Sequence, residues 1–320
     1  MNNIEKKKIY AVVGSTASGK SGLALALAER FGGEIISCDS MQIYRRMNIG
    51  TAKPTESEMA AVRHHMIDVV EPHDSFSCED YVRLASAAID DCISRGRLPI
   101  ICGGTGLYLD ALLRGGNSAP EVSGDENIRR ELVEFSEREG VQALHDRLRA
   151  VDPESADAIH PNNVKRVVRA LEIYLTCGVT KTELDRRSRQ LDSPYDARVV
   201  GLRYLDRSIL YRRIEERVDI MLRDGLLEET KALLGEGVFK VNGTAAQAIG
   251  YKELLGYIEG RQSLDEAIEE LKTATRRYAK RQITWFSAKP YVKWLDMDDE
   301  KGVKTFEEIV NNASELFSLS

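Results

Sequence analysis

A glycine-rich segment near the N-terminus has the residue types and spacing of a phosphate-binding loop. Residues 14–21 fit the P-loop pattern, in which two glycines separated by four residues are followed by lysine and by serine or threonine. Glycines let backbone amides approach phosphate oxygens, Lys20 adds positive charge, and the Ser21 hydroxyl can bind Mg²⁺. The segment therefore predicts a site for a diphosphate or triphosphate. Its residues are Gly14, Ser15, Thr16, Ala17, Ser18, Gly19, Lys20 and Ser21.

The segments on both sides of this loop support that prediction. Residues 9–13 form a short apolar, β-branched run typical of a buried strand, and residues 23–28 are leucines and alanines, which favour a helix. A helix that begins at the loop offers unpaired backbone N–H groups and the positive end of its dipole to a bound anion. A glycine turn without a ligand is the alternative, and the coincidence of strand, motif and helix argues against it. The loop identifies a ligand group but not a reaction.

Two further strand ends are expected beside the phosphate loop. Residues 34–38 indicate a buried strand that ends at Asp39, and α/β sheets bind ligands at the carboxyl ends of their strands. A strand at residues 98–102 runs into Gly103 and Thr105 and lacks the carboxylate with which P-loop NTPases organise Mg²⁺ and the attacking water. ATP hydrolysis is therefore disfavoured. At this point Asp39 has two interpretations, a cap for the following turn or a functional carboxylate.

A third strand is expected in residues 64–70, and it begins with two histidines. Side chains at adjacent strand positions point to opposite faces of a sheet, so His64 and His65 cannot easily bind one metal ion. We expect both histidines to make structural hydrogen bonds.

Two predicted helices carry clustered positive charge. In residues 163–176, Lys165, Arg166 and Arg169 lie within about one turn, and apolar residues occupy the other face. Residues 275–286 interleave basic and aromatic side chains, a pattern typical of nucleic-acid binding. A net charge of −6 argues against a protein coated in positive charge, although a local patch can still bind RNA. For the first helix, a merely solvated basic face is the alternative.

The length of 320 residues exceeds that of a typical single domain. The composition becomes helical and heavily charged in residues 119–190, so we expect an α/β core domain from residues 1–118 and 191–320 with a helical insertion domain between them. After residue 205 we expect only helices. No apolar stretch approaches the roughly 20 residues needed to cross a membrane, and five widely spaced cysteines give no disulfide or metal pattern. A cytoplasmic location and no membrane partner are expected.

These motifs together resemble the tRNA dimethylallyltransferase family over most of the chain. Two departures are small: Ser15 stands where the family usually has proline, and Asn163 where it often has aspartate, which caps a helix about equally well. The resemblance implies a P-loop NTPase-like α/β core, with a parallel sheet flanked by helices, and an all-helical insertion domain that grips the tRNA anticodon stem-loop. It rests on the P-loop and on residues 39–44, 50–54, 64–68, 103–108, 160–163, 169–172, 247–253 and 277–286.

The resemblance implies transfer of a dimethylallyl group from dimethylallyl diphosphate to N6 of the adenine immediately 3′ of the anticodon, with release of pyrophosphate. Loop amides, Lys20 and Mg²⁺ on Ser21 would stabilise the departing diphosphate, and Asp39 would accept the N6 proton. By resemblance, Arg217 is a further diphosphate clamp and Thr105 contacts the tRNA near the reacting atoms. The expected catalytic residues are thus Asp39, Lys20, Thr105 and Arg217, in a monomer.

The tRNA contacts are expected from two strand ends, the basic insertion helix and the C-terminal helical region. Three alternatives stay open: a P-loop kinase, an adenylate isopentenyltransferase acting on free nucleotides, and an RNA-binding protein without catalysis. The expected tRNA-binding residues are Asp39, Ser40, Met41, Gln42, Thr105, Asn163, Val164, Lys165, Arg166, Val167, Arg169, Gly250, Tyr251, Lys252, Arg277, Lys280, Arg281 and Gln282.

Overall fold

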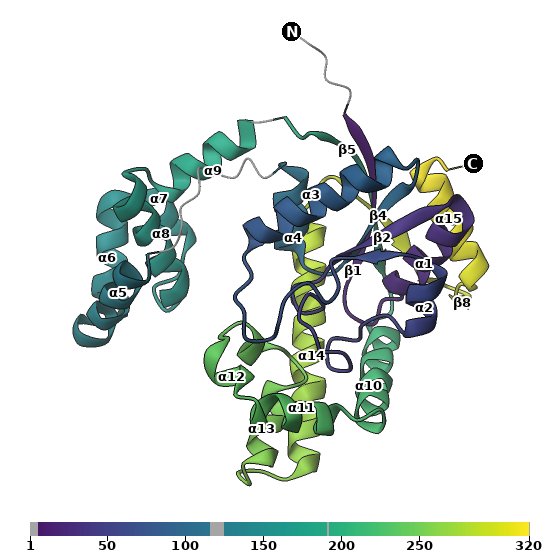
Figure 1. Ribbon diagram of the computed structural model, residues 1–320. Coiled ribbons are helices and arrows are strands. Elements are labelled where there is room, and N and C mark those ends of the chain that lie inside the picture. The colour runs from purple at the N-terminus through teal and green to yellow at the C-terminus, as the bar shows by residue number, and fades with distance from the viewer. Residues whose placement is uncertain (1–5, 116–124, 191, 320) are drawn as a thin grey trace. The chain divides into compact units, whose positions relative to one another are not determined.

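The computed structural model describes residues 6–115, 125–190 and 192–319 (Figure 1). The chain divides into two compact units: unit 1 consists of Met1–Leu113 and Tyr195–Ser320, and unit 2 consists of Arg114–Pro194. The domain boundaries expected after residues 118 and 190 fall on or beside positions outside the described residues.

Unit 1 is built on a six-stranded sheet with the order β3-β2-β4-β1-β5-β6, in which all neighbouring strands are parallel. Gly103 pairs in register with Val13 on one side and with Cys38 on the other. The P-loop, Asp39 and the glycine-rich turn therefore leave the same edge of the sheet. The strands are β1 (Lys7–Gly14), β2 (Gly33–Cys38), β3 (His64–His65), β4 (Leu98–Gly103), β5 (Tyr195–Arg203) and β6 (Val292–Asp296).

Helices cover both faces of this sheet, as expected for a parallel sheet whose strands are apolar throughout. Tyr10 and Val12 of β1 pack in the cluster that also contains residues of α1 (Lys20–Phe31) and α15 (Phe306–Phe317). Ile9, Ala11 and Val13 face the opposite way, into the cluster with α3 (Cys78–Ser94) and α4 (Gly106–Leu113). The predicted α/β core is confirmed.

Helices from the second half of unit 1 form a third apolar cluster together with Ile43, Tyr44 and Met47 of the loop after β2. The long helix α14 also contributes Ala279 and Phe286 to the two sheet clusters, so it joins this helical region to the sheet (Figure 1). Its start is fixed by a capping box between Ser263 and Glu266. The elements are α10 (Arg207–Arg223), α11 (Leu226–Gly235), α12 (Val238–Val241), the 3₁₀ helix η1 (Ala245–Gln247), α13 (Lys252–Ile258) and α14 (Leu264–Ser287).

In its described residues, unit 2 is helical, as expected for the insertion. Leu144, Leu148, Val167 and Leu171 form the centre of its own apolar cluster. This cluster explains why the amphipathic sequence of the basic helix folds with its valines inward. The helices are α5 (Glu126–Glu139), α6 (Val141–Val151), α7 (Pro153–Ala158), α8 (Val164–Cys177) and α9 (Lys181–Gln190).

Two expectations about secondary structure are wrong. The chain after β5 is not helical to its end, because β6 pairs with β5 at the sheet edge and β7 (Asp298–Asp299) forms a hairpin with β8 (Gly302–Val303). The expected strand at 64–70 contains only the two residues of β3, followed by an isolated bridge from Val70 to Tyr44. Within the described residues, which also include α2 (Glu56–Ala61), none of the helices combines the length and apolar character needed to cross a membrane.

Candidate functional site

The P-loop connects β1 to α1 and is held by its own hydrogen bonds. The Ser18 N–H and the Lys20 Nζ both donate to the Ser15 carbonyl, at 3.3 and 3.2 Å. Gly19 precedes the helix with a φ of 94°, a left-handed conformation that favours glycine. The helix N-terminus, with its unpaired amides, and the exposed Ser21 hydroxyl therefore lie at the carboxyl edge of the sheet.

Two arginines of α10 contact this loop. Arg217 donates from Nη1 to the Thr16 Oγ1 at 3.3 Å, and Arg213, one turn earlier, donates from Nε to the Ala17 carbonyl at 2.9 Å. The predicted clamp Arg217 is thus beside the loop. Arg213 was missed by sequence reasoning, although its spacing of four residues from Arg217 on a helix was an available signal.

The positive groups at the loop are poised for an anion. Burial lowers the pKa of the Lys20 ammonium, and the charge of Arg217 acts in the same direction, while Cys102 and Asp39 oppose it. Burial also lowers the pKa of the Arg217 guanidinium. Desolvated cations gain stability when a bound anion neutralises them.

Asp39 and Thr105 follow neighbouring strands, and Thr105 is hydrogen-bonded to the residues on either side of Asp39. The Thr105 N–H donates to the Cys38 carbonyl at 3.1 Å, and the Ser40 N–H donates to the Thr105 Oγ1 at 3.1 Å. One Asp39 oxygen, Oδ1, accepts the Met41 N–H at 2.8 Å, so the carboxylate does cap the following turn. This contact fixes the side chain and leaves Oδ2 for a ligand.

A cavity of about 410 Å³ in unit 1 is lined by P-loop residues and by Asp39, whereas Thr105 lies outside its lining. It runs from the P-loop past Asp39 to apolar side chains of the helical region. The structure thus brings together the expected phosphate-binding and carboxylate residues in one space. Residues in its lining include Thr16, Lys20, Ser21, Asp39, Arg217 and Tyr278.

Several side chains expected to bind tRNA in unit 1 have other roles. Tyr251 is fully buried and its hydroxyl donates to Glu229 at 2.7 Å, so this side chain is used within the protein. Gln282 is 5% exposed and its amide is used within the protein, but it also belongs to the cavity lining, so its expected RNA contact stays a prediction. The Gln42 side chain accepts a hydrogen bond from the Ser37 hydroxyl and donates to the backbone carbonyls of Thr51 and Ala52.

The other expected positions in the helical region of unit 1 are accessible or line the cavity. Gly250, Lys252 and Arg281 line the cavity together with Ser40 and Met41. Arg277 and Lys280 are exposed on α14 and lie outside that lining.

In unit 2, the basic helix presents only part of its predicted patch. Lys165 and Arg166 are exposed, and Val164 is half-buried. Val167 is fully buried in the core of the unit, so its side chain packs within the protein. Arg169 donates to the buried carboxylate of Glu172 at 2.7 Å, which also accepts from Arg129.

Asn163 begins α8 without the side-chain cap that the sequence predicted. Its side chain makes no capping hydrogen bond, and its backbone carbonyl instead accepts the N–H groups of Arg166 and Val167 at 2.9 and 3.1 Å. The half-buried side chain therefore stays a candidate RNA contact, since it is not used for capping.

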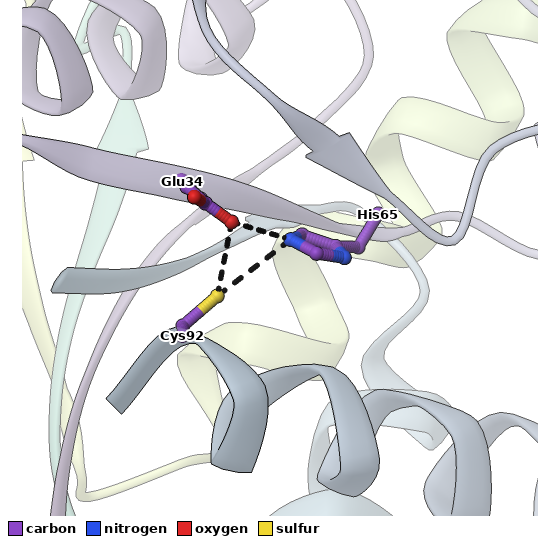
Figure 2. Close-up of side chains that lie close together, drawn as sticks. All are labelled: Glu34, His65 and Cys92. Atoms are coloured by element: carbon purple, nitrogen blue, oxygen red, sulfur yellow. Dashed lines mark hydrogen bonds and ion pairs between the residues drawn. The ribbon is translucent and has the colours of Figure 1, made fainter. Parts of the chain in front are cut away.

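At the amino-terminal end of β2, Glu34, His65 and Cys92 form a separate cluster (Figure 2). Their donor atoms are close enough to hold a metal ion, but Arg95 already donates to both Glu34 oxygens, at 2.5 and 2.7 Å. We therefore interpret the cluster as a structural ion pair that joins β2, β3 and α3. His64 lines the cavity instead, which confirms that the adjacent histidines face apart.

Comparisons with known proteins agree with this architecture. A family model described as IPP transferase matches residues 42–289. A relative from Geobacillus thermodenitrificans, named tRNA dimethylallyltransferase, is 51% identical over 304 residues, which make up 95% of each chain. The crystal structure of the full-length tRNA isopentenylpyrophosphate transferase from Bacillus halodurans has a TM-score of 0.71 and 45% identity, covering 98% of this chain and 97% of that one. A eukaryotic dimethylallyltransferase acting on tRNA has a TM-score of 0.78 and 31% identity, with coverage of 91% and 74%.

Proposed function

The chain belongs to the IPP transferase family, and we propose that it transfers the dimethylallyl group of dimethylallyl diphosphate to tRNA. The proposed acceptor is N6 of the adenine immediately 3′ of the anticodon. The observation that carries the proposal is the single cavity in which a P-loop, two desolvated cations and a carboxylate meet. Two relatives named tRNA dimethylallyltransferase match 95% and 96% of the chain, so the proposal applies to nearly its whole length.

The proposed reaction is a displacement at carbon. The allylic carbon–oxygen bond of the donor breaks, and pyrophosphate leaves with the electron pair. Loop amides, Lys20 and Arg217 are placed to stabilise the negative charge that develops there. The adenine N6 forms the new bond to carbon and loses a proton, which passes to the Asp39 carboxylate. Thr105 is proposed to hold the acceptor beside Asp39, since its hydroxyl lies next to that strand end.

The residues at the loop suit Mg²⁺. Ser21 offers a hard hydroxyl oxygen in the cavity lining, and Mg²⁺ in phosphate sites usually takes one or two protein ligands with water and phosphate oxygens. Ser21 would hold the ion, which neutralises charge on the departing diphosphate when it is bound.

Exposed cations are proposed to bind the anticodon stem-loop. Lys165 and Arg166 on α8 would contact backbone phosphates, as would Arg277 and Lys280 on α14, because they are accessible. The reacting base must leave its stack to reach the cavity, as bases do in other enzymes that modify them.

We further propose a cytoplasmic monomer; none of the five cysteines, all described, forms a disulfide.

One acceptor assay tests the proposed function. The protein is incubated with Mg²⁺, radiolabelled dimethylallyl diphosphate and tRNA, AMP or ATP in separate reactions. Label in tRNA alone, at the adenine next to the anticodon, is the expected result. Label in AMP would instead support an adenylate isopentenyltransferase, and phosphate transfer from ATP would support a kinase.

A substitution at Asp39 tests the assignment of the base. Asp39→Asn keeps an oxygen to accept the Met41 N–H but cannot accept a proton, so the turn is preserved while proton transfer is lost. We expect kcat to fall by about 100-fold or more, with tRNA affinity within about twofold. Asp265→Asn, an exposed carboxylate on α14, is the matched control. Normal turnover of the Asp39 variant would remove its assignment as base.

A further inference from the structure

We infer that Gln282 is a positioning residue that sets the P-loop relative to the acceptor end of the cavity; this inference rests on the proposed function. Its Oε1 accepts the Thr16 N–H at 2.8 Å, and its Nε2 donates to the Gly104 carbonyl at 3.0 Å. The two contacts belong to different strand-end turns, one after β1 and the other after β4. A single buried side chain on α14 therefore joins both turns.

The bridge requires a glutamine. One partner is a backbone donor and the other a backbone acceptor, and a carboxamide offers an acceptor and a donor side by side in one planar group. Glutamate would lose the donor, and methionine would lose both functions. Gly104 is buried, so loss of the Gln282 contact leaves its backbone carbonyl without this partner.

The turn after β4 is shaped to receive this side chain. A Cβ atom at Gly104 would lie 2.0 Å from the Gln282 Nε2, so any other residue there would displace the amide. One turn further along α14, Trp285 fills the space beside Gly106, where a Cβ would lie 2.2 Å from its ring. The two glycines thus let α14 lie directly against the backbone of the turn.

Each end of the bridge leads to a proposed functional group. Thr16, whose N–H bonds Gln282, accepts the Arg217 hydrogen bond through its hydroxyl. Gly104, at the other end, immediately precedes Thr105, which bonds the backbone of Ser40 next to Asp39. The Gln282 amide therefore fixes the distance between the P-loop, which is proposed to bind the diphosphate, and Thr105, which is proposed to hold the acceptor. A displacement of about 1 Å between reacting groups can cost about 100-fold in rate.

Two other roles for Gln282 make different predictions. A residue that contacts RNA affects tRNA affinity and leaves pyrophosphate affinity unchanged. A residue that only stabilises the fold lowers the unfolding temperature without changing kcat well below that temperature. A positioning residue lowers kcat and pyrophosphate affinity while tRNA affinity stays the same.

The test compares Gln282→Met and Gln282→Glu with the wild-type chain. Gln262→Met is the matched control, because Gln262 is a half-buried glutamine that donates to a backbone carbonyl away from the cavity. The measurements are kcat and KM for dimethylallyl diphosphate, Kd for tRNA by filter binding, Kd for Mg²⁺-pyrophosphate by calorimetry, and thermal unfolding. Should the methionine variant not fold, the nearly isosteric glutamate variant carries the test alone.

We expect both Gln282 variants to lower kcat by about 10- to 100-fold and to weaken pyrophosphate binding at least threefold, with tRNA Kd within twofold. The glutamate variant should bind pyrophosphate more weakly than the methionine variant, because it adds negative charge beside the loop. Unchanged kcat and pyrophosphate affinity in a folded variant would overturn the inference, as would a loss confined to tRNA binding. The pyrophosphate measurement needs no prenyl transfer. If the wild type proves inactive on tRNA, the proposed function fails, while calorimetry still decides whether Gln282 positions the loop.

Discussion

Replacing Glu34 by glutamine should remove a stabilising charge that depends on pH in a defined window. The Glu34 side chain is 7% exposed and receives two hydrogen bonds from Arg95 and one from His65. The Arg95 guanidinium is the main cause that lowers the pKa of Glu34 from 4.5 to about 2. A carboxylate with a lowered native pKa stabilises the fold fully above its unfolded pKa, and the stabilisation is lost as pH falls from about 4.5 toward 2.

The size of the effect follows from the two pKa values. At about 1.4 kcal/mol for each tenfold change, the difference between 4.5 and about 2 corresponds to about 3 kcal/mol of native stability at pH 7. Because the Arg95 side chain is 34% exposed, solvent screening reduces this to about 2 kcal/mol. The wild-type advantage should then shrink by about 1 kcal/mol between pH 5 and pH 3.5.

Urea unfolding followed by circular dichroism at pH 7, 5, 4 and 3.5 measures this difference. The matched control is Glu269→Gln, an exposed carboxylate in the second turn of α14, which should change stability by less than about 0.5 kcal/mol at each pH. A difference between wild type and Glu34→Gln that stays constant from pH 7 to pH 3.5 would refute the reasoning. A difference that vanishes at pH 7 would show that the ion pair contributes nothing.

Three further outcomes are expected. Burial lowers the pKa of Lys20, so pyrophosphate affinity measured by calorimetry should begin to fall, as pH rises, at a pH below the usual lysine pKa of 10.5. Lys20→Met should weaken pyrophosphate binding by about 30-fold and remove this pH dependence. A pH dependence that persists in the variant would show that another group titrates. Gly50→Ala places a Cβ atom 2.5 Å from the Tyr251 ring, so the urea midpoint of unfolding should drop by an amount equivalent to about 1–3 kcal/mol. An unchanged midpoint would mean that the Tyr251 ring moves aside without a cost in stability. Reversing Lys165 and Arg166 to glutamate should weaken tRNA binding and reduce the slope of log affinity against log salt by about 2 or more, whereas an unchanged slope would exclude these residues as phosphate contacts.

Local sequence patterns predicted the parts of the site that depend on neighbouring residues. The P-loop, the strand before it and the helix after it lie within one continuous segment, so spacing and apolar patterning were sufficient. The position of Asp39 after a strand followed in the same way, as did the glycine-rich end of β4. The amphipathic pattern of α8 predicted which face carries Lys165 and Arg166.

Tertiary structure alone decided which polar side chains turn inward. Gln282 appeared within a run of basic and aromatic residues that suggested RNA binding, but its partner Thr16 lies 266 residues earlier in the chain. Tyr251 is held by Glu229 and packs against Gly50, and neither contact has a local signal. Strand β6 pairs only with β5, about ninety residues earlier. The sequence by itself determined the phosphate loop, the strand-end carboxylate and the basic helix, because each depends on local spacing. The Gln282 bridge between the P-loop and the turn after β4 could not be predicted from the sequence, because its hydrogen bonds connect residues that only folding brings near.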